Sequence, residues 1–430
     1  MPRVSRALRR HKVIAAVALG VLTLAVLAGL ALRDGDSEET RAVPFRSSER
    51  VAFDGTNYFV VWDDDRGGQG RDIFGARVSH DGMVLDRPPI RISTAVGALA
   101  DPQVAFDGRN FLVVWSDERL KPDPDHSQHD VFGARITRAG VVLDRDGIPI
   151  STAERQQVEP KLAFEGSRFL VVWTDFRSYD GDIYGARVTT AGKVLDPTGF
   201  VISSGRNEHL HPTVVFDGTR YLVVWSEGVR GGYDIFGARV SRVGKTLNPK
   251  AIRISRGANA WDTPAVAFGD ENYLVAWTHW ETGYYQEVRG ARVSPDGIVL
   301  DPEGLVIAQG ENDNSGPKVA FDGSNYLVVW NETHEAEVEP ASFVETGDVY
   351  SARVSTDGAV LDAAVGRPIS TARGDQWAHG LGFDGASYFL ALMAERTPFS
   401  ERYDLRGVHL TREGERVERP PTTIAQADSR

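Results

Sequence analysis

The sequence predicts an all-β protein, a seven-bladed β-propeller of four-stranded blades, from three observations. A phrase that reads P-x-V-A-F-D-G-x-x-Y-L-V-V-W, then D-I-F-G-A-R-V, G-x-V-L-D and I-S, recurs seven times. A period of 52 to 62 residues, typical of propeller blades or solenoid units, separates its turn aromatics, Phe53, Phe106, Phe164, Phe216, Phe268, Phe321 and Phe383. Each copy also contains four short segments with the composition of β-strands.

The second segment of each repeat is apolar at every position, as in Tyr221 to Trp225, which predicts a strand covered on both faces. The D-I-F-G-A-R-V segment, for example Asp234 to Val240, has the β-branched and aromatic content of a third strand. P-x-V-A-F supplies the first strand, and the stretch from V-L-D to I-S supplies the fourth. Closing seven such sheets into a ring buries the faces of every blade against its neighbours.

These repeats resemble those of tandem-repeat propellers in secreted and surface proteins of bacteria. The resemblance covers residues 48–425, which implies that residues 426–430 form only a short tail. The Gly-His to Trp-Asp pairing of WD40 blades, the kelch double glycine and the Ser-x-Asp-x-Gly-x-x-Trp box of sialidases are missing. No functionally characterised family is matched, so the fold alone implies no activity.

The N-terminal 33 residues have the pattern of a basic cytoplasmic segment and a membrane helix. Five basic residues precede Val13 to Leu32, a stretch of twenty uncharged residues that is long enough to span a bilayer. The basic side stays in the cytoplasm, so the propeller is expected outside it, in the cell envelope, with residues 34–47 as a tether. The alternative is a cleaved signal peptide and secretion, which the small residues Ala28 and Gly29 allow.

Charge narrows the class of partner. The chain has a net charge of −12 and no cysteine, so neither a disulfide nor a lipid-modified cysteine is available. Beyond residue 33 the charge is −18, because the first 33 residues contain six basic residues and no acid. Such a surface repels nucleic acid and is compatible with cations, basic proteins or neutral glycans. Plain solubility explains the charge equally well.

Variation in length between repeats is concentrated in the loops between the second and third strands. The long ones are Ser116 to His129 and Asn331 to Gly347. In a propeller these loops emerge on the same face as the connections between blades, and rigid scaffolds carry binding residues on such loops. This face is the predicted working surface, although tolerated insertion also explains the lengths.

Five aromatic residues outside the strand pattern are candidate ligand-binding residues on that face. Trp261 and Trp377 lie in connections between blades, while Trp280, Tyr284 and Tyr285 lie in one loop of the fifth repeat. Exposed rings of this kind stack on sugars or anchor a protein partner. The alternative is that they cover the blade tops as packing residues.

A second set of candidates is expected at the mouth of the central channel, namely Asp101, Glu159, His209 and His211. Acids and histidines in a pocket would suit a polysaccharide hydrolase or lyase. No sequence motif supports enzymatic chemistry, because a G-x-S-x-G elbow, an H-E-x-x-H helix and a phosphate-binding loop are all missing. The motifs therefore assign no catalytic residue.

The repeated charges are interpreted as structural. The arginine of the third strand, for example Arg135, is expected to pair with the acid two residues after the tryptophan, here Asp117, inside the blade. The Asp-Gly pairs, such as Asp217-Gly218, are expected to form the hairpin turn between the first two strands.

Metal binding is predicted only weakly. The acidic runs at Asp63 to Asp65 and at Asp123, Asp125 and Asp130 offer oxygen ligands for Ca²⁺, but the Asp-x-Asp-x-Asp-Gly loop is missing. Pairs of histidines without a third ligand are a faint zinc signal. We therefore predict no metal and no cofactor.

The leading functional hypothesis from the sequence is an exported, membrane-anchored propeller that binds a protein or carbohydrate partner. The alternatives are an enzyme that hydrolyses or lyses polysaccharide at the channel mouth, and a purely structural component of the envelope.

Overall fold

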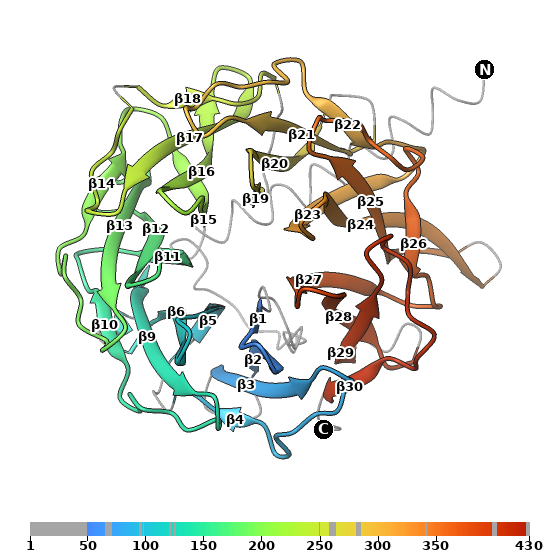
Figure 1. The fold of residues 1–430 in the computed structure, drawn as a ribbon, viewed down its shortest axis with the longest axis horizontal. Coiled ribbons are helices and arrows are strands. Elements are labelled where there is room, and N and C mark those ends of the chain that lie inside the picture. The colour runs from blue at the N-terminus through green and yellow to red at the C-terminus, as the bar shows by residue number, and fades with distance from the viewer. Residues whose placement is uncertain are drawn as a thin grey trace, which may run out of the picture.

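The protein forms a ring of seven β-sheets around a central axis (Figure 1). A computed structural model describes residues 50–64, 71–93, 97, 99–119, 122–123, 126–248, 250–257, 264–280, 285–339, 342–397 and 402–426. Each sheet contains four antiparallel strands, which confirms the predicted seven-bladed propeller. The expected membrane helix and tether, residues 1–47, lie outside these ranges. Within them, no helix combines the length and hydropathy that a bilayer crossing requires.

Each blade is built from one sequence repeat, with its first strand nearest the axis and its fourth at the rim (Figure 1). Blades 1 to 3 contain β1 (Arg50–Phe53), β2 (Asn57–Asp64), β3 (Asp72–Ser79) and β4 (Ile90–Arg91); β5 (Leu99–Phe106), β6 (Asn110–Asp117), β9 (Asp130–Thr137) and β10 (Ile148–Ser151), with the small hairpin β7 (Pro122–Asp123) and β8 (His126–Ser127); and β11 (Gln157–Phe164), β12 (Arg168–Asp175), β13 (Asp182–Thr189) and β14 (Phe200–Ser203).

The remaining four blades repeat the same order. Their strands are β15 (His209–Phe216), β16 (Arg220–Val229), β17 (Gly232–Ser241) and β18 (Ile252–Arg253); β19 (Ala265–Gly269), β20 (Asn272–His279), β21 (Glu287–Val293) and β22 (Leu305–Ala308); β23 (Asp313–Phe321), β24 (Asn325–Glu339), β25 (Ser342–Ser355) and β26 (Arg367–Ser370); and β27 (Gln376–Phe383), β28 (Tyr388–Glu395), β29 (Tyr403–Leu410) and β30 (Thr422–Ala425).

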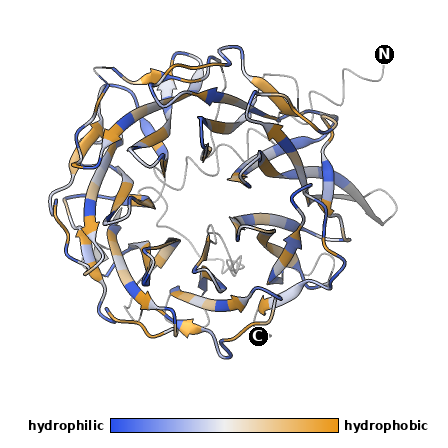
Figure 2. Ribbon diagram, viewed as in Figure 1, coloured by the Kyte–Doolittle hydropathy of each residue, from blue (hydrophilic) through white to orange (hydrophobic). Residues whose placement is uncertain are grey.

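The core lies between neighbouring blades, in seven apolar clusters that each draw side chains from two sheets. The uniformly apolar second strands, visible as hydrophobic segments in Figure 2, are buried along their length because both faces meet another blade. Ring closure uses the same packing, since Tyr58 of blade 1 stacks on Phe389 of blade 7 with 4.4 Å between ring centroids. All four strands of the seventh sheet come from the last repeat.

The Asp-Gly turns also join one blade to the next. In the fourth blade, Asp217 accepts the backbone N–H groups of Thr219 and Arg220 through Oδ1, at 2.7 Å each. Its Oδ2 accepts the hydroxyl of Tyr273, from the second strand of the fifth blade, at 2.6 Å. Asp384 receives the Tyr58 hydroxyl at 2.6 Å in the same way and so helps to close the ring. These aspartates are turn formers, as predicted, and they are also inter-blade contacts.

The predicted pairing of the third-strand arginine is wrong. Arg135 donates through Nε and Nη2 to Asp144, the aspartate of the V-L-D segment, at 2.8 Å each. The register explains the difference, because Arg135 lies opposite Leu112 while Asp117 lies five residues further along the strand. At about 3.3 Å per residue, that offset separates the two by roughly 16 Å. Asp117 instead accepts from the Trp115 indole at 2.8 Å.

The long connection expected as a loop at Asn331 to Gly347 is mostly β-structure. Strand β24 continues to Glu339 and β25 begins at Ser342, and the two pair along almost their whole length. The hairpin projects past β26 in Figure 1. In sequence, this polar stretch looks like a loop. In the structure, each strand of the hairpin satisfies the backbone hydrogen-bonding groups of the other.

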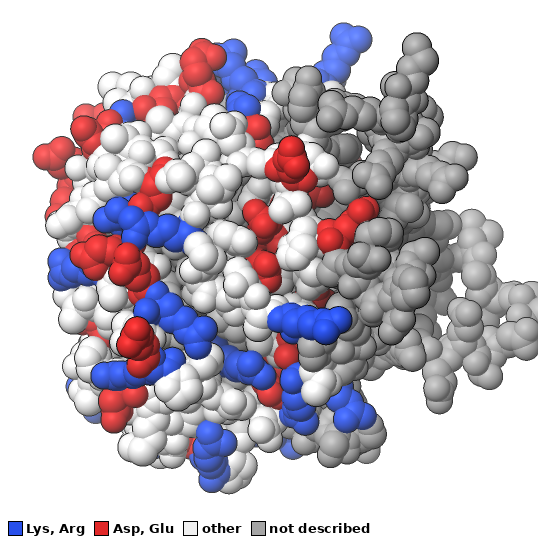
Figure 3. Space-filling view, turned by 90° about the vertical axis from the view of Figure 1, so that its right-hand side faces the viewer, with Lys and Arg blue, Asp and Glu red and all other residues white. Residues whose placement is uncertain are grey.

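Surface charge is mixed on the side of the molecule drawn in Figure 3, where basic and acidic side chains are interspersed. Ion pairs also lie at the rim of the ring, for example Arg135 with Asp144 in blade 2.

Candidate active site

The first strands of blades 2, 3 and 4 contain the same irregularity near their N-terminal ends. Pairing with the second strand shifts register there by means of a β-bulge. In each bulge a residue in the left-handed backbone region precedes a proline, and these residues are Asp101 (φ 55°), Glu159 (φ 56°) and His211 (φ 56°). β-bulges redirect side chains and are common beside active sites.

The backbone of this bulge is held by the preceding blade, independently of the side chain that it presents. The N–H of Glu159 donates to Ser116 Oγ at 3.2 Å, and the N–H of Gly316, at the same place in the sixth blade, donates to Thr278 Oγ1 at 3.1 Å. Gly316 has a φ of 62°, which glycine adopts without strain. A side chain in this conformation costs about 1–2 kcal/mol, so Asp101 and Glu159 stand where glycine would be the relaxed choice.

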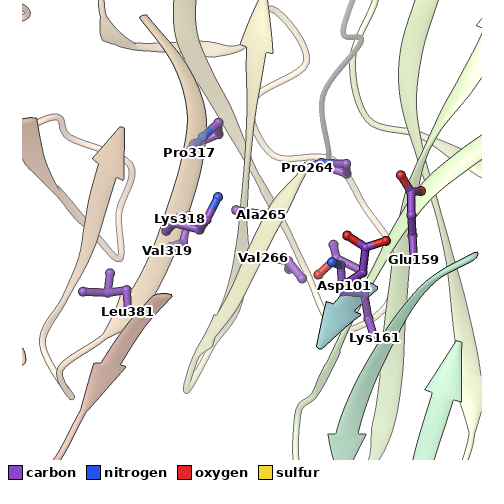
Figure 4. A pocket seen from close by; sticks show the side chains of 11 residues that line it. Asp101, Glu159, Lys161, Pro264, Ala265, Val266, Pro317, Lys318, Val319 and Leu381 are labelled. Atoms are coloured by element: carbon purple, nitrogen blue, oxygen red, sulfur yellow. The ribbon is translucent and has the colours of Figure 1, made fainter. Parts of the chain in front are cut away.

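A cavity of about 180 Å³ lies at this end of the channel (Figure 4). Asp101, Glu159 and Lys161 lie together on one wall, whereas Lys318 comes from the sixth blade on the other side. Its walls include Asp101, Glu159, Lys161, Val266, Lys318 and Leu381.

Glu159 and His211 form an ion pair across the junction of blades 3 and 4. The His211 Nδ1 lies 2.8 Å from Glu159 Oε1 and 2.9 Å from Oε2, so an Nδ1–H donates to both carboxylate oxygens. Thr174 Oγ1 is 3.5 Å from Oε2. The two side chains of the pair remain 27% and 29% exposed, so the carboxylate is oriented and still reachable from the cavity.

The environment raises the pKa of Asp101. Burial and the negative charge of Glu159 outweigh the positive charges of Lys161, His211 and Arg71, and the pKa of Asp101 rises to about 6. Asp101 therefore retains its proton at mildly acidic pH, where an ordinary aspartate has lost it.

The same cavity lowers the pKa of Glu159. Burial by itself would raise the pKa, but the charge and hydrogen bonds of His211, together with the charge of Lys161, outweigh burial and hold it below the usual value for glutamate. Neighbouring carboxyl groups with pKa values pushed in opposite directions are the arrangement that divides acid and base roles between two residues. Asp101 can donate a proton while Glu159 stays ionised.

His209, the fourth residue expected at the channel mouth, lies elsewhere. It is 3% exposed, with Nδ1 3.3 Å from the Gly181 carbonyl oxygen and Nε2 3.5 Å from Glu227. His209 occupies the repeat position of Gln157, whose amide binds backbone carbonyls of its own connection. It is therefore a structural residue between blades, whereas His211, two residues further on, lies in the bulge and turns to Glu159.

The aromatic candidates are only partly described. Trp280 and Tyr285 are half-buried at the two ends of the fifth blade's connection between β20 and β21. Trp377, in β27, is half-buried and packs against the apolar cluster of blades 7 and 1, so part of its ring serves packing. Trp261 and Tyr284 lie outside the described residues. The role of these five residues in ligand binding stays a prediction.

Sequence reasoning missed Lys161 and Lys318, which line the cavity. Each is two residues beyond the bulge position of its blade, next to a proline, and the repeat alignment carries that signal. Among the described residues, no group of three or more histidine or acidic side chains has the arrangement of a metal site. Two of the acidic residues considered for Ca²⁺, Asp65 and Asp125, lie outside the described ranges.

Comparison with known proteins identifies the fold and no family. No family model matches the chain, and no curated protein matches it. Among solved structures, a puromycin hydrolase mutant complexed with PGG has a TM-score of 0.55 at 14% identity, over 90% of this chain and 55% of that one. The chain thus spans about half the length of that hydrolase.

Hydrolases recur among the other similar structures. An acylaminoacyl peptidase from Pyrococcus horikoshii has a TM-score of 0.49 at 12% identity, over 92% of this chain and 54% of that one. An α-L-arabinofuranosidase from Lactobacillus brevis has a TM-score of 0.38 at 12% identity, over 77% of this chain and 97% of that one. At such identities the likeness is one of fold.

Proposed function

We propose that the cavity at the channel mouth is the active site of a hydrolase that cleaves glycosidic bonds. The observation that carries the proposal is the pair Asp101 and Glu159, two carboxyl groups in one cavity whose pKa values are shifted apart. Glycoside hydrolysis needs one protonated and one ionised carboxyl group flanking the scissile bond. The seven-bladed scaffold holds both on strands of adjacent blades, which fixes their spacing.

In the proposed mechanism Asp101 is the general acid. Its carboxyl proton passes to the glycosidic oxygen as the bond between that oxygen and the anomeric carbon breaks. Glu159 either attacks the anomeric carbon or removes a proton from the attacking water, and in both cases water supplies the hydroxyl of the new sugar end. His211, which donates to both oxygens of Glu159 in its resting position, keeps the carboxylate ionised and oriented.

The proposal is tested with the full-length protein and a panel of polysaccharides, by measuring new reducing ends. We expect Asp101→Asn and Glu159→Gln each to lower the rate by about 10²–10⁴, the usual contribution of a positioned acid or base. Asp144→Asn is the matched control, because it makes the same change in a carboxylate of the rim pair with Arg135 in the blade of Asp101. Its activity should stay at the wild-type level.

Two results would contradict the proposed roles of Asp101 and Glu159 in hydrolysis. Equal loss of activity in all three variants would show a general effect on folding. Products with a sugar double bond, detected by ultraviolet absorbance, would assign the cavity to a lyase, which eliminates across the ring and adds no water.

A binding module is the second candidate, favoured by the half-buried rings of Trp280 and Tyr285 on the connection between β20 and β21. It predicts retention on a glycan or protein partner that depends on Trp280 and is indifferent to Glu159. Retention of a glycan without turnover, lost in Trp280→Ala and kept in Glu159→Gln, would favour binding over hydrolysis.

A further inference from the structure

Two lysine side chains line the channel cavity in addition to the carboxyl groups of Asp101 and Glu159. In the repeat, the residue two positions after the bulge residue also lines the cavity, and it is Lys161 in blade 3, Thr213 in blade 4, Ala265 in blade 5 and Lys318 in blade 6. In blade 3 both positions line the cavity, through Glu159 in the bulge and Lys161 where regular pairing resumes. The cavity therefore combines two carboxyl groups with two ammonium groups.

The two lysines differ in position. Lys161 is 7% exposed and lies beside the carboxyl groups, since its charge lowers the pKa of both Asp101 and Glu159. Lys318 stands on the far wall, beyond Pro264, Ala265 and Val266 (Figure 4). Its Nζ lies 3.2 Å from the Gly316 carbonyl oxygen, and that hydrogen bond holds the ammonium group at the cavity wall.

This local charge runs against the charge of the whole molecule. The chain has a net charge of −12, so its long-range field repels anions. The described lining of the cavity contains two lysines, Lys161 and Lys318, together with the carboxyl groups of Asp101 and Glu159. Lys318 is half-buried on the wall opposite the reacting carboxyl groups, and an ammonium group in that position points to an anionic part of the ligand.

We propose that Lys318 is the subsite residue for a sugar carboxylate, and that the substrate is a uronic-acid-containing polysaccharide. This inference rests on the proposed glycoside hydrolysis for the position of the scissile bond. Val266, Val319 and Leu381 supply apolar surface between the two walls, which suits the C–H face of a sugar ring. A C6 carboxylate of the bound chain then lies at Lys318 while a glycosidic bond of the chain lies at Asp101 and Glu159.

The test compares uronate oligosaccharides, of the galacturonate, glucuronate and mannuronate series, with their C6-reduced neutral counterparts. Binding to the full-length protein is measured by titration calorimetry, and turnover is measured by new reducing ends. We expect Lys318→Met to weaken binding of the uronate about 10- to 100-fold, the range for a charge-assisted hydrogen bond, and to leave the neutral sugar unchanged. Lys318→Arg should restore most of the difference.

Lys193→Met is the matched control, because Lys193 is exposed on a rim turn of blade 3 and the charge change is the same. It should leave uronate binding unchanged. Thermal melts of each variant separate a lost contact from a lost fold, since Lys318→Met should retain the neutral-sugar affinity only if the cavity is intact.

The two proposals fail in different ways. Uronate binding that depends on Lys318, without turnover of any glycoside, would support the subsite and overturn hydrolysis. Cleavage of neutral and uronate chains at equal rates, with Lys318→Met unaffected, would overturn the subsite and leave hydrolysis standing. A preference for amino sugars over uronates would also overturn it, because cations would then be drawn to Asp101 and Glu159.

Discussion

At the scale of single residues, the channel mouth places polar side chains on backbone that suits glycine. Asp101, Glu159 and His211 share the left-handed conformation of Gly316 and a following proline. Strained residues of this kind concentrate at functional sites, because the surrounding structure has to enforce them. The bulge thus lowers local stability and sets the direction in which the side chain points.

The rate of hydrolysis should depend on pH as a bell. Asp101 acts only when protonated, so kcat/KM should fall as the pH rises through about 6, the pKa of Asp101. Glu159 acts only when ionised, so the rate should also fall in acid, below the usual pKa of glutamate. His211→Gln should move the acid limb to higher pH, because the charge that lowers the Glu159 pKa is gone. A rate that rises steadily above pH 7 would exclude these roles.

Replacement of Glu159 by glycine should cost activity and little stability. Relief of the left-handed conformation contributes about 1–2 kcal/mol, whereas loss of a partly exposed ion pair costs about 0–1 kcal/mol. The free energy of unfolding, from urea denaturation, should therefore stay level or rise, while hydrolysis is abolished. Val158→Gly, the adjacent residue with an ordinary backbone, should be destabilising. Equal destabilisation by the two changes would mean that the Glu159 side chain supports the fold.

At the scale of elements, the turn between the first two strands joins neighbouring blades. Tyr273 donates to Asp217, and burial together with that carboxylate holds the pKa of Tyr273 well above its ordinary value, so the hydroxyl keeps its proton. Blades 2 and 3 carry phenylalanine at this position, Phe111 and Phe169, and pack there without the hydrogen bond. The hydrogen bond from Tyr273 to Asp217 therefore adds to a contact that apolar packing already stabilises.

Tyr273→Phe should lower the free energy of unfolding by about 1–3 kcal/mol, the value of a hydrogen bond to a charged group. The reverse change, Phe111→Tyr, offers a hydroxyl to Asp54 of the first-blade turn and should be neutral or stabilising. Both are measured by urea denaturation at pH 7. If Tyr273→Phe left stability unchanged, the contact between turn and strand would be incidental to blade packing.

At the scale of the whole molecule, repeated rim pairs make the ring sensitive to acid. Burial alone would raise the pKa of Asp144, but hydrogen bonds and charge from Arg135 outweigh it and lower the pKa. The same holds in other blades for Asp196, Asp301 and Asp362. Since the folded pKa is depressed, each pair stabilises the fold above the unfolded pKa of about 4 and loses that effect as the pH falls through the folded value.

Stability should accordingly be level near neutral pH and decline below about pH 4. Blade 4 provides the model for a test, because Asn248 stands there in place of the aspartate and still accepts from the Arg239 N–H at 2.8 Å. Asp144→Asn should cost about 1 kcal/mol at pH 7, as befits a partly exposed pair, and less at pH 3, below the unfolded pKa. Urea midpoints at both pH values decide this, and an equal cost at both would show that packing, rather than charge, is lost.

Much of the architecture followed from periodicity. The repeat of Phe106, Phe164 and their equivalents, with uniformly apolar second strands, predicted blade number, strand number and the buried tryptophans, because such strands are stable only between other sheets. Asp101, Glu159, His209 and His211 were also expected at the channel mouth, and of these the cavity lining contains Asp101 and Glu159. These features depend on local pattern and on where each segment lies in a known ring geometry.

Which side chains meet was decided by register and by neighbouring blades. Arg135 finds Asp144 instead of Asp117, because antiparallel pairing places the latter about five residues away along the strand. His209 turns between blades while His211 turns to Glu159, and the bulge that separates their surroundings has no unique sequence signal. The sequence alone determined the propeller and its repeated core, whereas tertiary structure decided the pairs and the charge of the cavity, because those depend on residues from different repeats.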